Sequence, residues 1–371
     1  MAQLVWHSNI FDYTGYAKAA RQYVLALHAS GVDVKLETTQ AQLPDVDLPA
    51  DQMQILRHLA MKRKHSQRKV YLFHYIPDLW WRSLHPSIGF TYWETSKLPQ
   101  QWVYRANKMN AVFLPSTHNM EVFRRSGIKV PLFHIRPCLH LPQGSESQEH
   151  IPPYIHELPP FRFLAVCSWI ERKGIDLLLK SFWSEFHESE PVSLVIKTVA
   201  GPDISSSIEA WKQEARLSHP PAVVYVDTQV RSELEMDALY RSCHAFVHPT
   251  RGEGVGYPMM EAVARGLPVI ATNWGGQLDY LNANNSYLIP YHLVPVKPQA
   301  YYYGYQSDQL WAEPSIEALR AFMRQVINDY HTAALRAQSA QQYLFQHFTP
   351  QAAAQDMLQA LQQLTSLHFQ V

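Results

Sequence analysis

Two series of short apolar runs, each run followed by a helical pattern, occupy the two halves of this 371-residue chain. Such an alternation predicts parallel sheets covered by helices. The sequence therefore predicts an α/β fold with two domains, each built on a doubly wound parallel sheet. The expected strands lie near residues 3–8, 32–38, 70–75, 88–93, 111–116 and 132–137, and then near 161–167, 192–199, 222–227, 245–250 and 268–273.

A stretch rich in Pro, Gln, Ser and Glu, LPQGSESQEHIPPYIHELPP at 141–160, separates the two series. This composition is typical of an interdomain linker. We expect a first domain over residues 1–157 and a second over 158–371. We also expect a central cleft facing the carboxyl ends of both sheets, where open α/β sheets bind ligands.

The end of the chain predicts a helix over about residues 350–366. Thr349 and Pro350 suit a cap followed by the first helical position. An apolar face follows at helical spacing, and packing against the first domain is one arrangement open to this helix. That face consists of Met357, Leu358, Leu361 and Leu364.

Composition and charge exclude several classes of protein. Lys plus Arg equals Asp plus Glu at 32 each, so no overall field recruits nucleic acid. The first residues lack the pattern of a signal peptide, and no apolar stretch approaches the ~18 residues that span a bilayer. Cys138, Cys167 and Cys243 lie far apart, without disulfide or zinc spacing. We therefore expect a cytoplasmic protein.

The most informative segment is FVHPTRGEGVGYPMMEAVARGLPVIATNWGG, residues 246–276. It predicts a buried strand, a glycine-rich loop, and a helix with Pro258 at its first position and Gly266 at its end. Free amides at a helix start bind anions such as a diphosphate, and glycines let the backbone approach the ligand. Glu253 and Glu261 can then accept hydrogen bonds from sugar hydroxyls. An ordinary loop–helix junction with surface glutamates is the alternative interpretation.

The spacing of Glu253 and Glu261, followed by AVARGLPVIAT and a Gly-Gly pair, resembles the signature of retaining glycosyltransferases of family four. The resemblance implies the GT-B fold of two Rossmann-like domains. It also implies transfer of a hexosyl-type sugar from a nucleoside-diphosphate sugar to a hydroxyl of a glycan or lipid-linked acceptor, without cofactor or metal, in a setting such as polysaccharide biosynthesis. Glu261 would hold the ribose and Glu253 the donor sugar. The loop residues expected at the donor are Gly254, Val255 and Gly256.

The segment SWIERKGIDLLL, residues 168–179, resembles the part of the family whose lysine neutralises the donor diphosphate. Lys173 matches that lysine and would stabilise charge on the leaving group. The family usually has an arginine five residues earlier, where this chain has Ser168; Arg172 is the candidate substitute. The segment VDTQV, residues 226–230, resembles the loop that meets the nucleotide base, which assigns Thr228 and Val230 to the donor site.

Candidates in the first half are fewer. Gly15, after the predicted cap Thr14, would permit close approach to a phosphate; a simple turn glycine is the alternative. The segment IGFTYWETSKLP, residues 88–99, resembles the place where many family members carry a histidine near the reacting sugar. Here Trp93 or Glu94 stands there, and we hypothesise that Glu94 contacts donor or acceptor hydroxyls; a helix-capping glutamate is the alternative. His74, at a strand end, is a further candidate.

Three other patterns have ordinary interpretations. The motif Asp45-Val-Asp47 and the trio of His134, Cys138 and His140 suggest metal binding, but we expect loop and strand residues there. A basic cluster predicts a solvated helix face, with peripheral contact to the inner face of a membrane as the alternative, at about 1 kcal/mol for each cation. This cluster consists of Lys62, Arg63, Lys64, Arg68 and Lys69.

Two rival functions share the expected fold. A sugar-nucleotide epimerase would convert its donor without any acceptor. A non-catalytic GT-B scaffold would keep the fold and lose the chemistry, and the absent arginine and histidine keep this alternative open.

Overall fold

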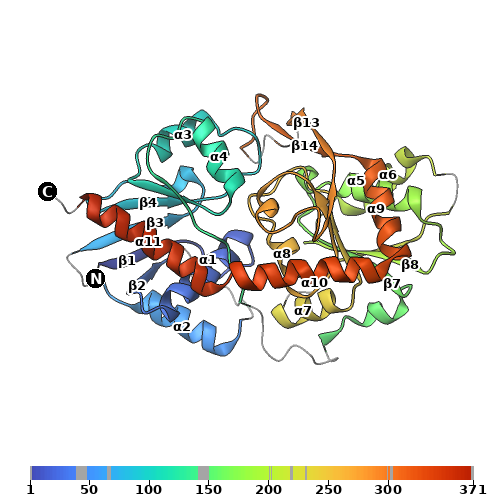
Figure 1. Cartoon of the computed structure of the whole chain (residues 1–371), viewed down its shortest axis with the longest axis horizontal. Coiled ribbons are helices and arrows are strands. Elements are labelled where there is room, and N and C mark those ends of the chain that lie inside the picture. The colour runs from blue at the N-terminus through green and yellow to red at the C-terminus, as the bar shows by residue number, and fades with distance from the viewer. Residues whose placement is uncertain are drawn as a thin grey trace. The chain divides into compact units, whose positions relative to one another are not determined.

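The structure is a computed structural model of the chain (Figure 1). It describes residues 2–38, 48–64, 68–140, 150–199, 201, 203–217, 220–229, 232–298, 300 and 304–368. The chain forms two compact units, Met1–Leu141 with Gln346–Val371, and Pro142–Phe345. Each unit is described by itself, and the predicted functional boundary after residue 157 stays a prediction.

The first unit is built on a six-stranded sheet with the order β2-β1-β3-β4-β5-β6, and every pairing is parallel. Strands β4 and β5 are buried along their whole length, as expected for a parallel sheet covered on both faces. All six predicted strands are present. They are β1 (Gln3–His7), β2 (Val34–Glu37), β3 (Lys69–His74), β4 (Ser87–Phe90), β5 (Ala111–Leu114) and β6 (Leu132–His134). The helices are α1 (Gly15–Ala29), α2 (Ala50–Met61), η1 (Pro77–Leu79), α3 (Gln100–Ala106), α4 (Thr117–Arg125) and α11 (Pro350–His368).

Helix α11 belongs to this unit and packs against α1. Its start is as predicted: the Thr349 hydroxyl accepts a hydrogen bond from the Ala352 amide, and Pro350 is the first helical residue. The Arg136 guanidinium donates to both oxygens of Asp356, at 2.7 and 2.8 Å. This bidentate pair fixes α11 to the segment that follows β6.

The second unit has its own six-stranded parallel sheet, in the order β12-β11-β10-β7-β8-β9. Five of its strands were predicted; β12 was missed because three residues show no periodicity. The strands are β7 (Phe161–Val166), β8 (Val192–Lys197), β9 (Val223–Asp227), β10 (Ala245–His248), β11 (Val269–Thr272) and β12 (Tyr287–Ile289). The helices are η3 (Pro153–Glu157), η4 (Glu171–Lys173), α5 (Ile175–Glu185), α6 (Ile204–Ala215), α7 (Glu233–Arg241), α8 (Tyr257–Ala264), η5 (Gly276–Asp279), α9 (Ile316–Asn328) and α10 (Tyr330–His347).

The order of these strands places a topological switch point between β7 and β10. The chain runs outward from β7 through β8 and β9, and then returns to β10 on the other side of β7. Open α/β sheets bind ligands outside the carboxyl ends of the strands at such a point. The loop after β7 carries Lys173 and the loop after β10 carries Glu253, so the fold itself predicts a site where these loops meet.

A β-hairpin outside both parallel sheets was not predicted. Strands β13 (Tyr291–Pro295) and β14 (Leu310–Pro314) pair antiparallel. Prolines at 290, 295 and 298 interrupt this stretch, and proline is uncommon inside strands. The Ala312 amide donates to the Arg251 carbonyl at 2.9 Å, so the hairpin is bonded to the loop after β10. Within the described part of the chain, no helix combines the length and apolarity needed to cross a membrane.

Candidate functional site

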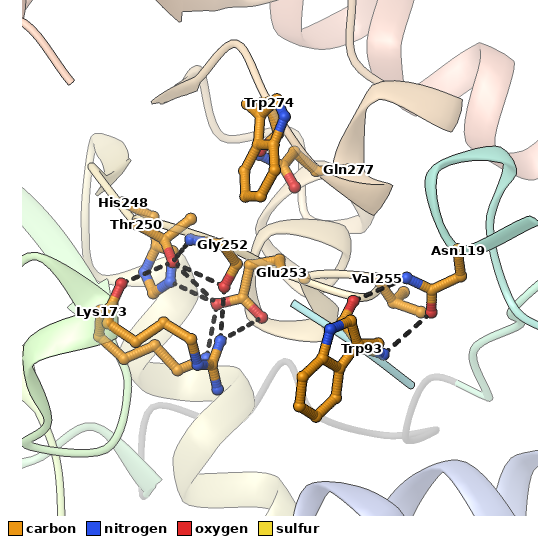
Figure 2. A network of polar contacts seen from close by, with 12 residues as sticks. Trp93, Asn119, Lys173, His248, Thr250, Gly252, Glu253, Val255, Trp274 and Gln277 are labelled. Carbon is orange, nitrogen blue, oxygen red and sulfur yellow. Dashed lines mark hydrogen bonds and ion pairs between the residues drawn. The ribbon is translucent and has the colours of Figure 1, made fainter. Parts of the chain in front are cut away.

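Glu253 lies at the centre of a charged cluster in the second unit. Its side chain is 8% exposed, and its carboxylate accepts a hydrogen bond from Lys173 Nζ at 2.5 Å. Arg172 Nη1 lies 3.5 Å from the other carboxylate oxygen and donates to the Gly252 carbonyl at 2.5 Å. Figure 2 shows the lysine reaching across to the glutamate. Two loops, each at the end of a strand beside the switch point, thus meet through these three side chains.

His248 and Thr250 complete the cluster, and the sequence analysis did not single them out. His248 Nε2 lies 3.1 Å from the Glu253 carboxylate, to which it donates (Figure 2). Burial lowers the pKa of His248, so the ring is neutral at pH 7. The Thr250 hydroxyl lies 3.1 Å from the carbonyl oxygens of both Arg172 and Gly252. The sequence signal for His248 was its place at the end of the apolar strand AFVH. A buried histidine with a purely structural role gives the same pattern.

The charges of this cluster do not cancel. Burial alone would raise the pKa of Glu253, but Lys173, Arg172 and the His248 hydrogen bond hold it well below its usual range. The carboxylate is therefore ionised at pH 7. One negative and two positive side chains leave these three groups with a net charge of +1, since His248 is neutral. A further anion is the partner that such a cluster favours.

The backbone beside the cations requires glycine. Gly174, which follows Lys173, has φ +68°, and a Cβ on it would lie 2.0 Å from the Pro249 carbonyl oxygen. Gly256 has φ +80° and is the cap of α8. Helix α8 begins at Tyr257, so Pro258 is its second residue, and the prediction that Pro258 is the first residue is wrong.

Replacing Gly174 with alanine should therefore lower the free energy of unfolding by about 2–5 kcal/mol, the sum of left-handed strain and overpacking. Urea denaturation measures this change. Gly15→Ala is the matched control, because a Cβ there meets nothing within 4 Å. Equal stability of the two variants would contradict the packing described for Gly174.

Glu261, in α8, is held by a separate set of contacts. The Tyr240 hydroxyl donates to its carboxylate at 3.0 Å. The Tyr280 hydroxyl lies 3.0 Å from the carbonyl oxygen of Val255 and 2.8 Å from that of Gly256, which orders the glycine-rich loop. At the start of α7, Ser232 and Glu235 form a capping box.

The other predicted donor residues are dispersed. Thr228 follows β9 and is half-buried, whereas Val230 lies outside the described residues. Gly15 begins α1 in the first unit, where the Thr14 hydroxyl accepts from the Ala17 amide, as predicted. Glu94 lies in the irregular segment between β4 and α3. Because the cap of α3 is Pro99, the alternative that Glu94 caps a helix is wrong.

The remaining candidates have structural roles or lie elsewhere. His74 is fully buried, stacks on Phe90 and bonds to the Tyr92 hydroxyl at 2.9 Å; burial lowers its pKa to about 3. The prediction that the basic cluster forms a helix face is wrong, because its described residues follow the end of α2 and Lys69 begins β3. Lys62 pairs with Asp33 and Lys64 with Glu37, which neutralises two of these cations. Asp45 and Asp47 lie outside the described residues. Among those described, no three His, Cys, Asp or Glu side chains are grouped to hold a metal.

Comparison with known proteins identifies the domain that carries this site. Residues 160–298 match the family model described as glycosyl transferases group 1. The matched residues lie in the second unit and include Lys173, Glu253 and Glu261, so this part of the chain is similar to group 1 glycosyltransferases. The resemblance to glycosyltransferases inferred from Glu253 and Glu261 is confirmed at the level of group 1, and the assignment to family four stays a prediction. The chain is 27% identical, over 176 residues, to the GtfA subunit of the UDP-N-acetylglucosamine–peptide N-acetylglucosaminyltransferase of Streptococcus pneumoniae. That match covers 47% of this chain and only 33% of the relative.

Solved structures show the fold of the whole chain. Anabaena HepE, in complex with UDP-glucose, has a TM-score of 0.67 at 12% identity over 98% of this chain and all of that one. Sucrose-phosphate synthase from Thermosynechococcus elongatus has a TM-score of 0.66 at 17% identity, over 99% of this chain and all of that one. TarM of S. aureus has a TM-score of 0.58 at 14% identity, and the match covers 78% of this chain and 55% of TarM. The predicted GT-B fold, with two Rossmann-like parallel sheets, is confirmed.

Proposed function

We propose that this chain is a retaining, metal-independent glycosyltransferase. It would move a hexosyl-type sugar from a nucleoside-diphosphate sugar to a hydroxyl of a glycan or lipid-linked acceptor. The observation that carries the proposal is the cluster of Lys173, Arg172 and Glu253, with its surplus positive charge, at the switch point of a domain similar to group 1 glycosyltransferases. A diphosphate supplies the anion that this cluster favours.

The cluster suggests how the donor is activated. Diphosphate oxygens would take over the Lys173 and Arg172 donors that Glu253 engages in this structure. The bond between the anomeric carbon and the phosphate oxygen breaks with its electron pair on the phosphate, where Lys173 stabilises the new charge. The acceptor hydroxyl attacks from the same face and passes its proton to the departing phosphate. Arg172 supplies the cation that Ser168 does not.

The neutral His248 has a supporting role in this scheme. It donates to Glu253 Oε1, the same oxygen that accepts from Lys173. When a diphosphate draws Lys173 away, this bond and the buried setting would keep the Glu253 carboxylate ordered for the donor sugar.

The base is proposed to be uracil, because several relatives of this fold are described with UDP. Calorimetry of the wild-type chain with UDP, GDP and ADP tests this assignment. We expect UDP to bind at least about tenfold more tightly than the other two, a difference of 1.4 kcal/mol, and EDTA to leave its affinity unchanged. Binding of none of the three would favour the non-catalytic scaffold. A new sugar nucleotide formed without acceptor would favour the epimerase.

A further inference from the structure

Arg251, two residues before Glu253, is the most deeply buried charged side chain of the described second unit, with a side-chain exposure of 0%. Its Nη1 and Nη2 atoms each donate to one oxygen of Asp176, both at 2.9 Å. Its Nε and Nη2 donate to the two oxygens of Glu313, at 2.6 and 3.1 Å. Nη1 also donates to the Glu171 carbonyl at 2.5 Å. All five N–H groups of the guanidinium are therefore used.

These bonds join three segments that are far apart in the sequence. Asp176 lies in the first turn of α5, Glu313 on β14, and Glu171 at the start of η4, which contains Arg172 and Lys173. The backbone of Arg251 contributes as well, because its amide donates to the Arg172 carbonyl at 2.7 Å. The two cations thus lie on a short segment that Arg251 bonds at Glu171 and Arg172 and, beyond Lys173, at Asp176.

The hairpin reinforces the same segment. The Ala312 amide donates to the Arg251 carbonyl, and Lys297, just after β13, pairs with Glu171 at 2.8 Å. Glu313 lies beyond residues 160–298, which match the family model. The carboxylate that completes this network is therefore a feature of this chain outside the matched region.

Burying Arg251 fully and its two carboxylate partners in part is a costly way to gain stability, because the desolvation penalty offsets much of the attraction. A buried network with every donor used does, however, fix one conformation. Arg251 cannot serve as a ligand of the diphosphate, since it is inaccessible and its donors are occupied. Its effect on the site must pass through the groups that it holds.

We propose that Arg251 is a positioning residue that couples the β13–β14 hairpin to the segment of Arg172 and Lys173 and so sets these cations for the diphosphate. This inference rests on the proposed function of the cluster. Because the network includes Glu313, the hairpin would act on the donor site through Arg251.

Two conservative variants test the coupling. Glu313→Gln keeps an acceptor and removes the charge, whereas Arg251→Lys keeps the charge and removes the fork geometry. We expect each to weaken UDP binding about 10- to 100-fold, as happens to metal affinity when a hydrogen-bond partner of a metal ligand is removed. In a Lys173→Ala background the effect of Glu313→Gln should shrink, because one of the two cations through which it acts is gone and only Arg172 remains.

Arg324→Lys is the matched control. Arg324, on α9, also bridges two carboxylates, those of Glu185 and Glu190, and donates to a backbone carbonyl. The Arg324 side chain is 32% exposed, so we expect this variant to lower stability less than Arg251→Lys does and to leave UDP affinity unchanged. If Arg251→Lys and Glu313→Gln lower stability but, like Arg324→Lys, leave UDP affinity within about twofold, Arg251 is merely structural and the proposal fails.

Amide hydrogen exchange supplies a readout that needs no nucleotide. In Glu313→Gln, the amides of residues 171–176 should exchange faster than in the wild type, whereas in Arg324→Lys they should not. Unchanged exchange at 171–176 overturns the coupling whatever the chain binds. Faster exchange in Glu313→Gln, combined with a wild-type chain that binds no nucleoside diphosphate, would support the coupling and overturn the proposed function.

Discussion

Lys173→Ala should lower the turnover number about 10²- to 10³-fold, the usual cost of removing one preorganised group that stabilises transition-state charge. In this structure Lys173 Nζ bonds to Glu253 and is part of a cluster with a surplus positive charge. Its loss removes a cation from the leaving diphosphate, so UDP affinity should fall together with turnover. Initial rates with a UDP-sugar donor and calorimetry with UDP measure the two effects.

Lys180→Ala is the matched control for this variant. Lys180 also bonds to a glutamate at 2.5 Å, but its partner Glu214 is 60% exposed, and exposed pairs contribute little. We expect normal turnover and stability in this control. Near-normal turnover in Lys173→Ala itself would overturn the role assigned to the cluster.

The effect of Lys173→Ala on the free energy of unfolding should depend on pH. Burial would raise the pKa of Glu253, but in the folded chain its cations hold it well below the usual 4.5. A lowered folded pKa contributes stability above the unfolded pKa, and this contribution is lost as the pH falls through the folded value. Lys173→Ala removes much of it. The difference in unfolding free energy between wild type and variant should therefore be largest near pH 7 and shrink below pH 4.5, as urea denaturation across this range can show.

The strands were predictable because each carries a buried apolar run between helical patterns. The loops that bear Lys173 and Glu253 were predictable for the same reason, since both follow such a strand. Their contact was not predictable from spacing, because the residues lie 80 positions apart. It follows from the placement of β10 beside β7, which depends on the topology of the whole sheet.

The features missed by the sequence analysis share a physical cause. Nothing in the sequence distinguishes Arg251 from an ordinary loop arginine, because its partners Asp176 and Glu313 are 75 and 62 positions away. His248 is a single polar residue in an apolar strand, a pattern that buried structural histidines also give. Networks made of distant residues leave no local periodicity, so only the three-dimensional arrangement reveals them.

Glu253→Gln should also lower turnover about 10²- to 10³-fold, but with the opposite effect on nucleotide binding. The amide keeps the size of the side chain and loses the charge that Lys173 and Arg172 neutralise in this structure. The two cations are then more available to a diphosphate. We therefore expect UDP affinity to stay at the wild-type level or rise, whereas the added affinity that the sugar of a UDP-sugar provides is lost.

This opposition between the two variants separates the roles of the two residues. Glu185→Gln is the control for Glu253→Gln, because Glu185 also accepts from cationic side chains, those of Arg320 and Arg324, on another part of the unit. It should change neither rate nor affinity. If Glu253→Gln loses UDP affinity as Lys173→Ala does, Glu253 serves only to hold the cations in place. If it retains UDP affinity and loses transfer, the carboxylate acts on the sugar, because that is the part of the donor that UDP lacks.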